Sequence, residues 1–144
     1  MKQITFKGSV EIKELWGGRY FITETTGEDI PMPWSNGKLV TVKDMSIDGY
    51  DNTKEKFVKA VIDNEFETGI IMMEGSYDAA TRTITYKVET ASHQHEDMEP
   101  GTEMEFHYLV KFVDKAHFVI ENEQFIAGKK INTTELKYTR INGR

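Results

Sequence analysis

Cysteine is absent from this chain of 144 residues, so neither a disulfide framework nor thiolate chemistry is available to it. A chain without disulfides suits a reducing compartment, and we expect a cytoplasmic protein. No stretch approaches the ~20 consecutive apolar residues that a membrane-spanning helix needs. The N-terminal stretch MKQITFKGSVEIK is interrupted by charges and lacks the apolar segment of a secretory signal. We therefore expect no signal peptide and no membrane partner.

Clusters of basic residues are also scarce. The formal net charge is −6, acids and bases are interspersed, and the longest basic run is Lys129-Lys130. Nucleic-acid-binding proteins usually carry a basic face, so we expect no nucleic-acid partner. The length is typical of one domain, and we expect residues 1–144 to form one.

The dominant pattern in the sequence is an alternation of apolar and polar residues with a period of two. In the segment EMEFHYLVKFV, residues 103–113, one side carries Met104, Phe106, Tyr108, Val110 and Phe112 and the other carries Glu103, Glu105, His107 and Lys111. This pattern is typical of a half-buried strand. Further strand-like segments, rich in β-branched and aromatic residues, are Ile4–Ile12, Arg19–Thr25, Lys38–Ile47, Thr68–Gly75, Thr83–Val88, His117–Phe125 and Ile131–Ile141.

Short turn signals separate these segments. Asn36-Gly37 is typical of a type I′ hairpin turn, which needs positive φ at both central residues. Pro100-Gly101, Asp114-Lys115 and Gly128-Lys129 mark further turns. Such connections are too short for parallel crossovers. The sequence therefore predicts an all-β fold, an antiparallel meander of about nine or ten strands that closes into a barrel or packs as a sandwich.

Residues 51–62 fit two kinds of element. The run Asp51-Asn52-Thr53-Lys54-Glu55 offers a capping residue with a glutamate placed to reach back, as at a helix start. The apolar residues that follow also alternate as in a strand. The unit Tyr50-Asp51 recurs as Tyr77-Asp78, which leads into the strand-like run TITYKV. We therefore predict a strand from about 55 to 63, with each aspartate capping backbone N–H groups in a hairpin turn.

Several stretches, in this order and spacing, resemble a known family. They are Gly17–Tyr20, Gly49–Asn52, Ile62-Asp63, Thr68–Ile70, Glu74–Asp78, Thr81–Tyr86 and Leu136–Arg140. Together they resemble the bacterial family designated domain of unknown function 1579, which is grouped with the calycins, the lipocalin-like antiparallel barrels. The resemblance covers about residues 5 to 141 and implies a barrel with an interior cavity, but no activity and no catalytic residues.

The chain departs from the family pattern in its early part. No strand bearing a tryptophan precedes Lys2, Val61 stands where members often carry tryptophan, and the region from Ile30 to Ser46 is longer than usual. A missing first strand would leave an open edge, and open edges invite pairing with another chain. We expect either an incompletely closed barrel covered by the N-terminal segment or a homodimer.

The most tempting metal-binding cluster is the segment HQHED. His93 and His95 face the same way if this segment is a strand, and carboxylates follow them. A zinc site takes three or four such ligands, and no third ligand is fixed here. We interpret the segment as a polar loop, with His93 and His95 as weak metal candidates, and expect no cofactor.

Other polar residues have structural interpretations. His107 belongs to the outward side of its strand together with Glu105, and a solvated histidine is the expected role. Asp51, Asp63 and Asp78 are more typical of turns and backbone capping than of acid–base chemistry. No serine lies in a recognisable nucleophile motif, so we expect no catalytic residue.

The apolar face is the better candidate for a functional surface. Small barrels fill themselves with side chains, whereas eight or more strands leave room for one small ligand. Methionines and tyrosines suit an adaptable apolar pocket with a few polar groups. The predicted cavity-lining residues are Trp16, Tyr20, Met72, Tyr86, Phe106 and Tyr108.

Three functions fit this sequence. The first is a non-enzymatic, lipocalin-like binder of a small apolar or amphipathic ligand. The second is an enzyme, a hydrolase or isomerase, that uses polar groups in the cavity, which requires at least two convergent titratable groups. The third is a structural or oligomerisation module with a filled interior and an apolar outer patch.

Overall fold

A computed structural model describes residues 5, 7–31, 35–64, 69–90 and 104–141. Every regular element in these ranges is a strand, and none is a helix. The strands are β1 Gly8–Leu15, β2 Tyr20–Pro31, β3 Leu39–Asp51, β4 Lys56–Asp63, β5 Ile71–Asp78, β6 Thr83–Thr90, β7 Met104–Phe112, β8 His117–Ile126 and β9 Lys129–Thr139. Within these ranges there is accordingly no helix long and apolar enough to cross a membrane.

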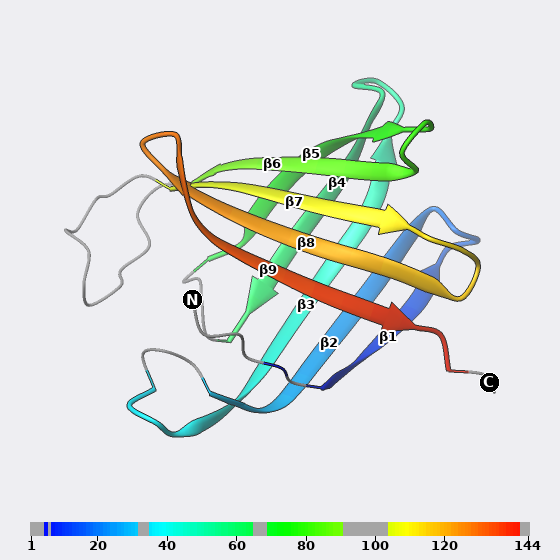
Figure 1. Cartoon of the computed structure of the whole chain (residues 1–144). Helices are drawn as coiled ribbons and strands as arrows, with labels where there is room; N and C mark the ends of the chain where they lie inside the picture. The colour runs from blue at the N-terminus through cyan, green and yellow to red at the C-terminus, as the bar shows by residue number, and fades with distance from the viewer. Residues whose placement is uncertain (1–4, 6, 32–34, 65–68, 91–103, 142–144) are drawn as a thin grey trace. The chain divides into compact units, whose positions relative to one another are not determined.

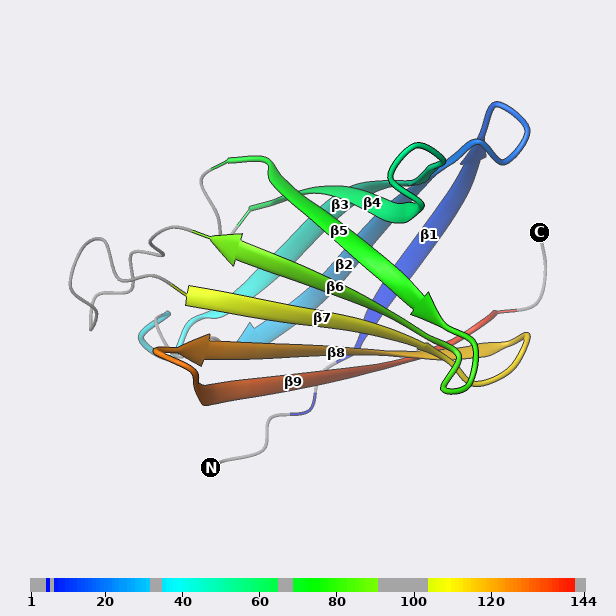
Figure 2. The ribbon, with the colours of Figure 1, turned by 90° about the horizontal axis from the view of Figure 1, so that it is seen from above.

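The spatial order of the strands is the same as their order along the chain, β1 to β9 (Figures 1 and 2). The pairs β1–β2, β2–β3, β5–β6, β6–β7, β7–β8 and β8–β9 are all antiparallel. Where the connection is short, as between β5 and β6 or between β8 and β9, this arrangement follows because a parallel pair needs a long crossover. The predicted all-β antiparallel meander is confirmed.

The strands divide into two compact units. Unit 1 comprises residues 1–50 and 58–72, and unit 2 comprises residues 51–57 and 73–144. Unit 1 therefore contains β1, β2 and most of β3 and β4, whereas unit 2 contains β6 to β9 and most of β5.

The second strand is longer than the predicted Arg19–Thr25. It continues to Pro31, with a break in the β2–β3 register between Gly27 and Ile30 where Asp29 has φ 54°. A bulge of this kind lets a long strand bend and resume its pairing, so that Ile30, 5% exposed, is buried. Pro31, which has no backbone N–H to donate, follows this bulge directly, and bulges are places where sheets accept proline.

Two hairpins have the turn chemistry that their glycines predict. Asn36 and Gly37 have φ 50° and 79°, and Lys38 N donates to Ser35 O at 3.0 Å. Positive φ at both central residues defines a type I′ turn, as predicted. Ala127 and Gly128, with φ 49° and 76°, make the corresponding turn between β8 and β9.

The two Tyr-Asp units play the same part, as predicted. Asp51 Oδ1 accepts from Thr53 N and Lys54 N at 2.8 and 3.0 Å, and Asp78 Oδ1 accepts from Ala80 N at 2.9 Å. Four residues after each aspartate, the chain adopts φ 53°. Because this turn leads directly into β4, the segment from residue 56 to 63 is a strand and not a helix.

Apart from Ile30 on β2, the most deeply buried apolar side chains of the described residues lie on β6. Ile84, Tyr86 and Val88 are 8%, 3% and 4% exposed. They occupy alternate positions of the strand and so share one of its faces. This face of unit 2 carries the candidate site.

Candidate functional site

Away from the β8–β9 hairpin, where Lys129 pairs with Ile126, strands β6 to β9 present one face without charge. Directly opposed residues of antiparallel neighbours lie on the same face, so the register assigns the side chains of this surface. We call it the uncharged face; its described members are Ile84, Tyr86, Val88, Phe106, Tyr108, Val110, Phe112, Phe118, Ile120, Asn122, Gln124, Thr134, Leu136 and Tyr138. Not one of these side chains is ionisable near neutral pH, which makes the surface suited to an uncharged or apolar partner.

The uncharged face is organised in rows that run across the strands. One row, here the polar row, joins Tyr86, Tyr108, Asn122 and Thr134 by direct cross-strand pairing. The next row, here the aliphatic row, joins Ile84, Val110, Ile120 and Leu136. Amide and hydroxyl groups thus lie beside a purely aliphatic strip, and the two tyrosine rings meet edge to face with centroids 6.1 Å apart.

Asn122 carries the unusual feature of the polar row. Its side-chain Oδ1 is buried and has no hydrogen-bond partner among the described residues. A buried acceptor left unpaired costs about 1–3 kcal/mol, and native structures rarely leave one in place without a reason. The atom is therefore a candidate anchor for a group that donates a hydrogen bond.

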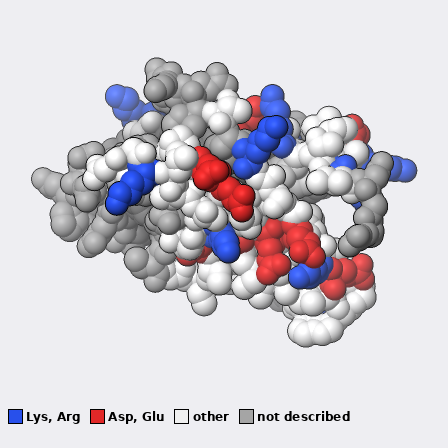
Figure 3. Space-filling view, turned by 90° about the horizontal axis from the view of Figure 1, so that it is seen from below, with Lys and Arg blue, Asp and Glu red and all other residues white. Residues whose placement is uncertain are grey.

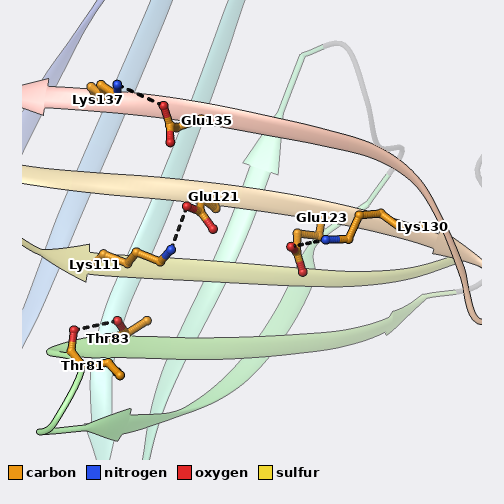
Figure 4. Close-up of polar contacts among 8 residues, drawn as sticks. All are labelled: Thr81, Thr83, Lys111, Glu121, Glu123, Lys130, Glu135 and Lys137. Atoms are coloured by element: carbon orange, nitrogen blue, oxygen red, sulfur yellow. Dashed lines mark hydrogen bonds and ion pairs between the residues drawn. The ribbon is translucent and has the colours of Figure 1, made fainter. Parts of the chain in front are cut away.

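The opposite face of the same strands, here the charged face, is covered by ion pairs. Lys111 Nζ lies 2.7 Å from Glu121 Oε1, Lys130 Nζ lies 2.6 Å from Glu123 Oε1, and a third pair joins Lys137 and Glu135 at 3.2 Å. Figure 4 shows these pairs spread over β7, β8 and β9. These three ion pairs of β7 to β9 therefore lie on the side opposite the uncharged face.

His107 belongs to the charged face, as predicted for an outward histidine. Its Nε2 lies 2.5 Å from Glu105 Oε1, and its ring lies 4.7 Å from the ring of Phe125. Acidic and basic side chains also lie next to one another on the surface seen from below (Figure 3). His107 is thus held on the charged face by an acidic partner and a ring contact.

The structure brings together three of the six predicted cavity-lining residues. Tyr86, Phe106 and Tyr108 share the uncharged face. The other three belong to unit 1. There Trp16 lies in the turn after β1, 80% exposed and with φ 50°, Tyr20 packs edge-on against it with ring centroids 5.8 Å apart, and Met72 is 65% exposed.

His93 and His95 fall in the segment 91–103, outside the described residues. Among the residues that the structure does describe, no three histidine, aspartate or glutamate side chains are grouped so that they could hold a metal ion.

A second polar cluster lies in unit 1. Lys59, 8% exposed, reaches from β4 to β3, where its Nζ lies 2.5 Å from Asp48 Oδ1 and donates to Ser46 Oγ at 3.2 Å. Ser46 Oγ in turn donates to Asp48 Oδ2 at 2.9 Å, and Thr23 Oγ1 donates to the same oxygen at 3.4 Å. We call these residues, together with Asp44, the Lys59 cluster.

The pKa of Asp44, at the edge of the Lys59 cluster, is shifted by burial and by neighbouring groups. Burial raises the pKa of this carboxyl above its ordinary value, and the nearby carboxylates Asp63 and Asp48 act in the same direction. A hydrogen bond from Thr25 and the charge of Lys59 oppose the rise in pKa. The net effect on the pKa of Asp44 is a rise, so burial and the two carboxylates outweigh Thr25 and Lys59.

The Lys59 cluster is suited to holding strands together more than to chemistry. Ser46 is 4% exposed, and its hydroxyl both donates and accepts within the cluster. A nucleophilic serine needs an exposed oxygen beside a base that is free to take its proton. The paired and buried Ser46 meets neither requirement.

Comparison with known families identifies the family of this chain. A family model described as protein of unknown function (DUF1579) matches residues 1–140. The chain belongs to this family. No curated protein matches it. The resemblance drawn from the sequence motifs is therefore confirmed for the family, and the function of this DUF1579 protein has to be argued from its own residues.

Sequence reasoning missed both polar features of this DUF1579 protein. Lys59 was not singled out from the sequence, although Asp44, Ser46 and Asp48 alternate as a polar strip on a neighbouring strand. Asn122 was overlooked because FVIENEQF contains several polar residues and no clean alternation. Only the register with β7 shows that Asn122, and not its glutamate neighbours, shares a face with Tyr108.

Proposed function

We propose that this DUF1579 protein is a non-enzymatic binding domain for a small amphipathic molecule, which packs on the uncharged face of β6 to β9. The observation that carries the proposal is the unpaired, buried Oδ1 of Asn122 in a row with Tyr86 and Tyr108. Ligand sites are mostly apolar surfaces with a few placed polar groups that fix orientation. The uncharged face has this composition.

The apolar part of the face supplies the affinity in this proposal. Burying apolar area contributes roughly 25 cal/mol per Å², and aromatic rings add edge-to-face contacts. Asn122 supplies orientation, because a ligand that pairs its Oδ1 removes an existing penalty. The lipocalin-like barrel implied by the family resemblance would enclose such a ligand and is part of the same proposal.

Binding is tested with N-phenyl-1-naphthylamine, an uncharged aromatic probe whose fluorescence rises when it leaves water. We expect saturable binding to the wild-type protein and weaker binding to Ile120→Asp, which places a carboxylate in the aliphatic row beside Asn122. Glu121→Gln, the adjacent position on the charged face, is the matched control and should bind as the wild type does.

Native mass spectrometry of the freshly purified protein provides an independent check. A co-purified neutral molecule released on denaturation supports the proposal. Absence of saturable probe binding, or equal binding to Ile120→Asp and wild type in folded protein, rejects it.

A further inference from the structure

We infer that the ligand of the uncharged face is electrically neutral and donates a hydrogen bond to Asn122 Oδ1, as an alcohol, phenol or secondary amide does. This inference rests on the proposed function and names the chemical class that the same site selects. It sets this face apart from a site for fatty acids or other carboxylates.

The absence of charge on this face argues for a neutral ligand. Across residues 84–88, 106–112, 118–124 and 134–138, each side chain that the register assigns to the face is apolar, aromatic, hydroxyl or amide. Lys111, Lys130 and Lys137 lie with their acidic partners on the opposite face. A carboxylate or ammonium placed here would be desolvated without a counter-charge, which is strongly unfavourable.

The state of Asn122 argues for a donor. A side-chain carbonyl oxygen accepts hydrogen bonds and cannot donate them, and this one is buried and unpaired in the described part of the chain. An ether or ester oxygen of a ligand would leave it unpaired, whereas a hydroxyl or N–H group would satisfy it. The preference for a donor is therefore set by this atom.

The position of the rows constrains the shape of the ligand. Residues two apart on a strand, such as Ile120 and Asn122, are separated by roughly 7 Å, and neighbouring strands by about 4.8 Å. A donor that reaches Asn122 Oδ1 thus lies next to the aliphatic row on one side and near Phe106 and Gln124 on the other. The structure favours a donor attached directly to an apolar body over one at the end of a polar chain.

Four ligands of equal chain length test the inference by displacing N-phenyl-1-naphthylamine: 1-decanol, decyl methyl ether, decanoate and decylammonium, all at neutral pH. We expect 1-decanol to displace the probe at roughly 2- to 10-fold lower concentration than the ether, the range of one neutral hydrogen bond. Both ions should be weaker than the alcohol by at least about tenfold.

Asn122→Leu removes the acceptor while keeping the side-chain volume similar. We expect this variant to bind the alcohol and the ether equally well, and Glu121→Gln to keep the wild-type preference. The four-ligand series on the wild-type protein decides the question even if Asn122→Leu does not fold.

The outcomes separate the two claims. Decanoate or decylammonium binding as well as the alcohol overturns neutrality while leaving the proposed function standing. An ether that binds as well as the alcohol to wild type overturns the donor assignment. Failure of the probe and all four ligands to bind rejects the proposed function itself.

Discussion

Gly75 and Tyr86 are direct cross-strand partners, and the tyrosine ring occupies the space beside the glycine. A Cβ at position 75 would lie 2.7 Å from Tyr86 Cδ1 and 2.9 Å from Thr85 O. Unit 1 contains the same relationship between Gly49 and Tyr20, where a Cβ would lie 2.7 Å from the ring. In each unit a tyrosine is thus held against the sheet by a glycine.

Gly75→Ala should destabilise the protein by about 1–3 kcal/mol, because the added methyl group must displace a buried ring or a backbone oxygen. Urea unfolding monitored by circular dichroism measures the change. Gly69→Ala is the control, since a Cβ there meets nothing within 4 Å, and it should change stability by less than about 0.5 kcal/mol. Equal stabilities of the two variants would contradict the packing described here.

The Lys59–Asp48 pair predicts a large effect from removing one partner only. Lys59→Met leaves the partly buried Asp48 carboxylate without its 2.5 Å ammonium partner and should cost about 3–5 kcal/mol. Lys59→Met combined with Asp48→Asn should recover part of that loss, because the uncompensated charge is gone. A double-mutant cycle by urea unfolding measures the coupling.

The exposed pair Lys13–Glu24 is the matched control for the buried pair. Its side chains are 54% and 48% exposed at a distance of 3.4 Å, so Lys13→Met should cost less than about 1 kcal/mol. Comparable losses at both positions would show that burial does not distinguish them.

Asp44 predicts a pH dependence of stability. Burial raises its pKa above the ordinary 3.8, so the folded protein holds this proton to higher pH than the unfolded chain does. The stabilisation from Asp44 is then fully present below 3.8 and lost as the pH rises through the raised pKa. The free energy of unfolding of wild type relative to Asp44→Asn should therefore fall across this interval.

Asp114 provides a comparison of opposite sign. The backbone N–H of Ala116 and the His117 side chain lower the pKa of Asp114. The free energy of unfolding of wild type relative to Asp114→Asn should therefore increase as the pH rises through the lowered pKa toward 3.8. The stability gained in this way should persist at higher pH. Slopes of the same sign for the two variants in urea unfolding at a series of pH values would refute one of these assignments.

The two Tyr-Asp turns predict a ranked pair of effects. Asp51 accepts from two backbone N–H groups and Asp78 from one. Each hydrogen bond to a charged group contributes about 1.5–3 kcal/mol, so Asp51→Ala should destabilise more than Asp78→Ala. Urea unfolding of the two variants tests the ranking. Asp51→Asn is the control and should retain most of the stability, because its amide oxygen still accepts.

The strands and turns were largely predictable because they depend on local chemistry. The alternation of apolar and polar residues predicted β7, and the Asn36-Gly37 pair predicted a type I′ turn. The repeated Tyr-Asp unit favoured a strand over a helix for β4. The extension of β2 to Pro31 escaped prediction, since a bulge at Asp29 interrupts the pattern that a strand shows in sequence.

The Lys59 cluster and the unpaired Asn122 oxygen escaped prediction for another reason. The partners of Lys59 and the isolation of Asn122 Oδ1 depend on which residues of separate strands are opposed, and register is not encoded in any one segment. That Tyr86, Phe106 and Tyr108 share a face was predictable, because aromatic residues at alternate positions of a strand point the same way. The predicted roles of Trp16, Tyr20 and Met72 relied on residue type alone.

The most direct test of the central claim is an NMR titration of the wild-type protein with 1-decanol, following the side-chain amide of Asn122. We predict saturable shifts of this amide and of the backbone N–H groups of Tyr108 and Thr134, its direct cross-strand partners. Saturation of the protein with ligand while these resonances stay unchanged would contradict binding at the uncharged face.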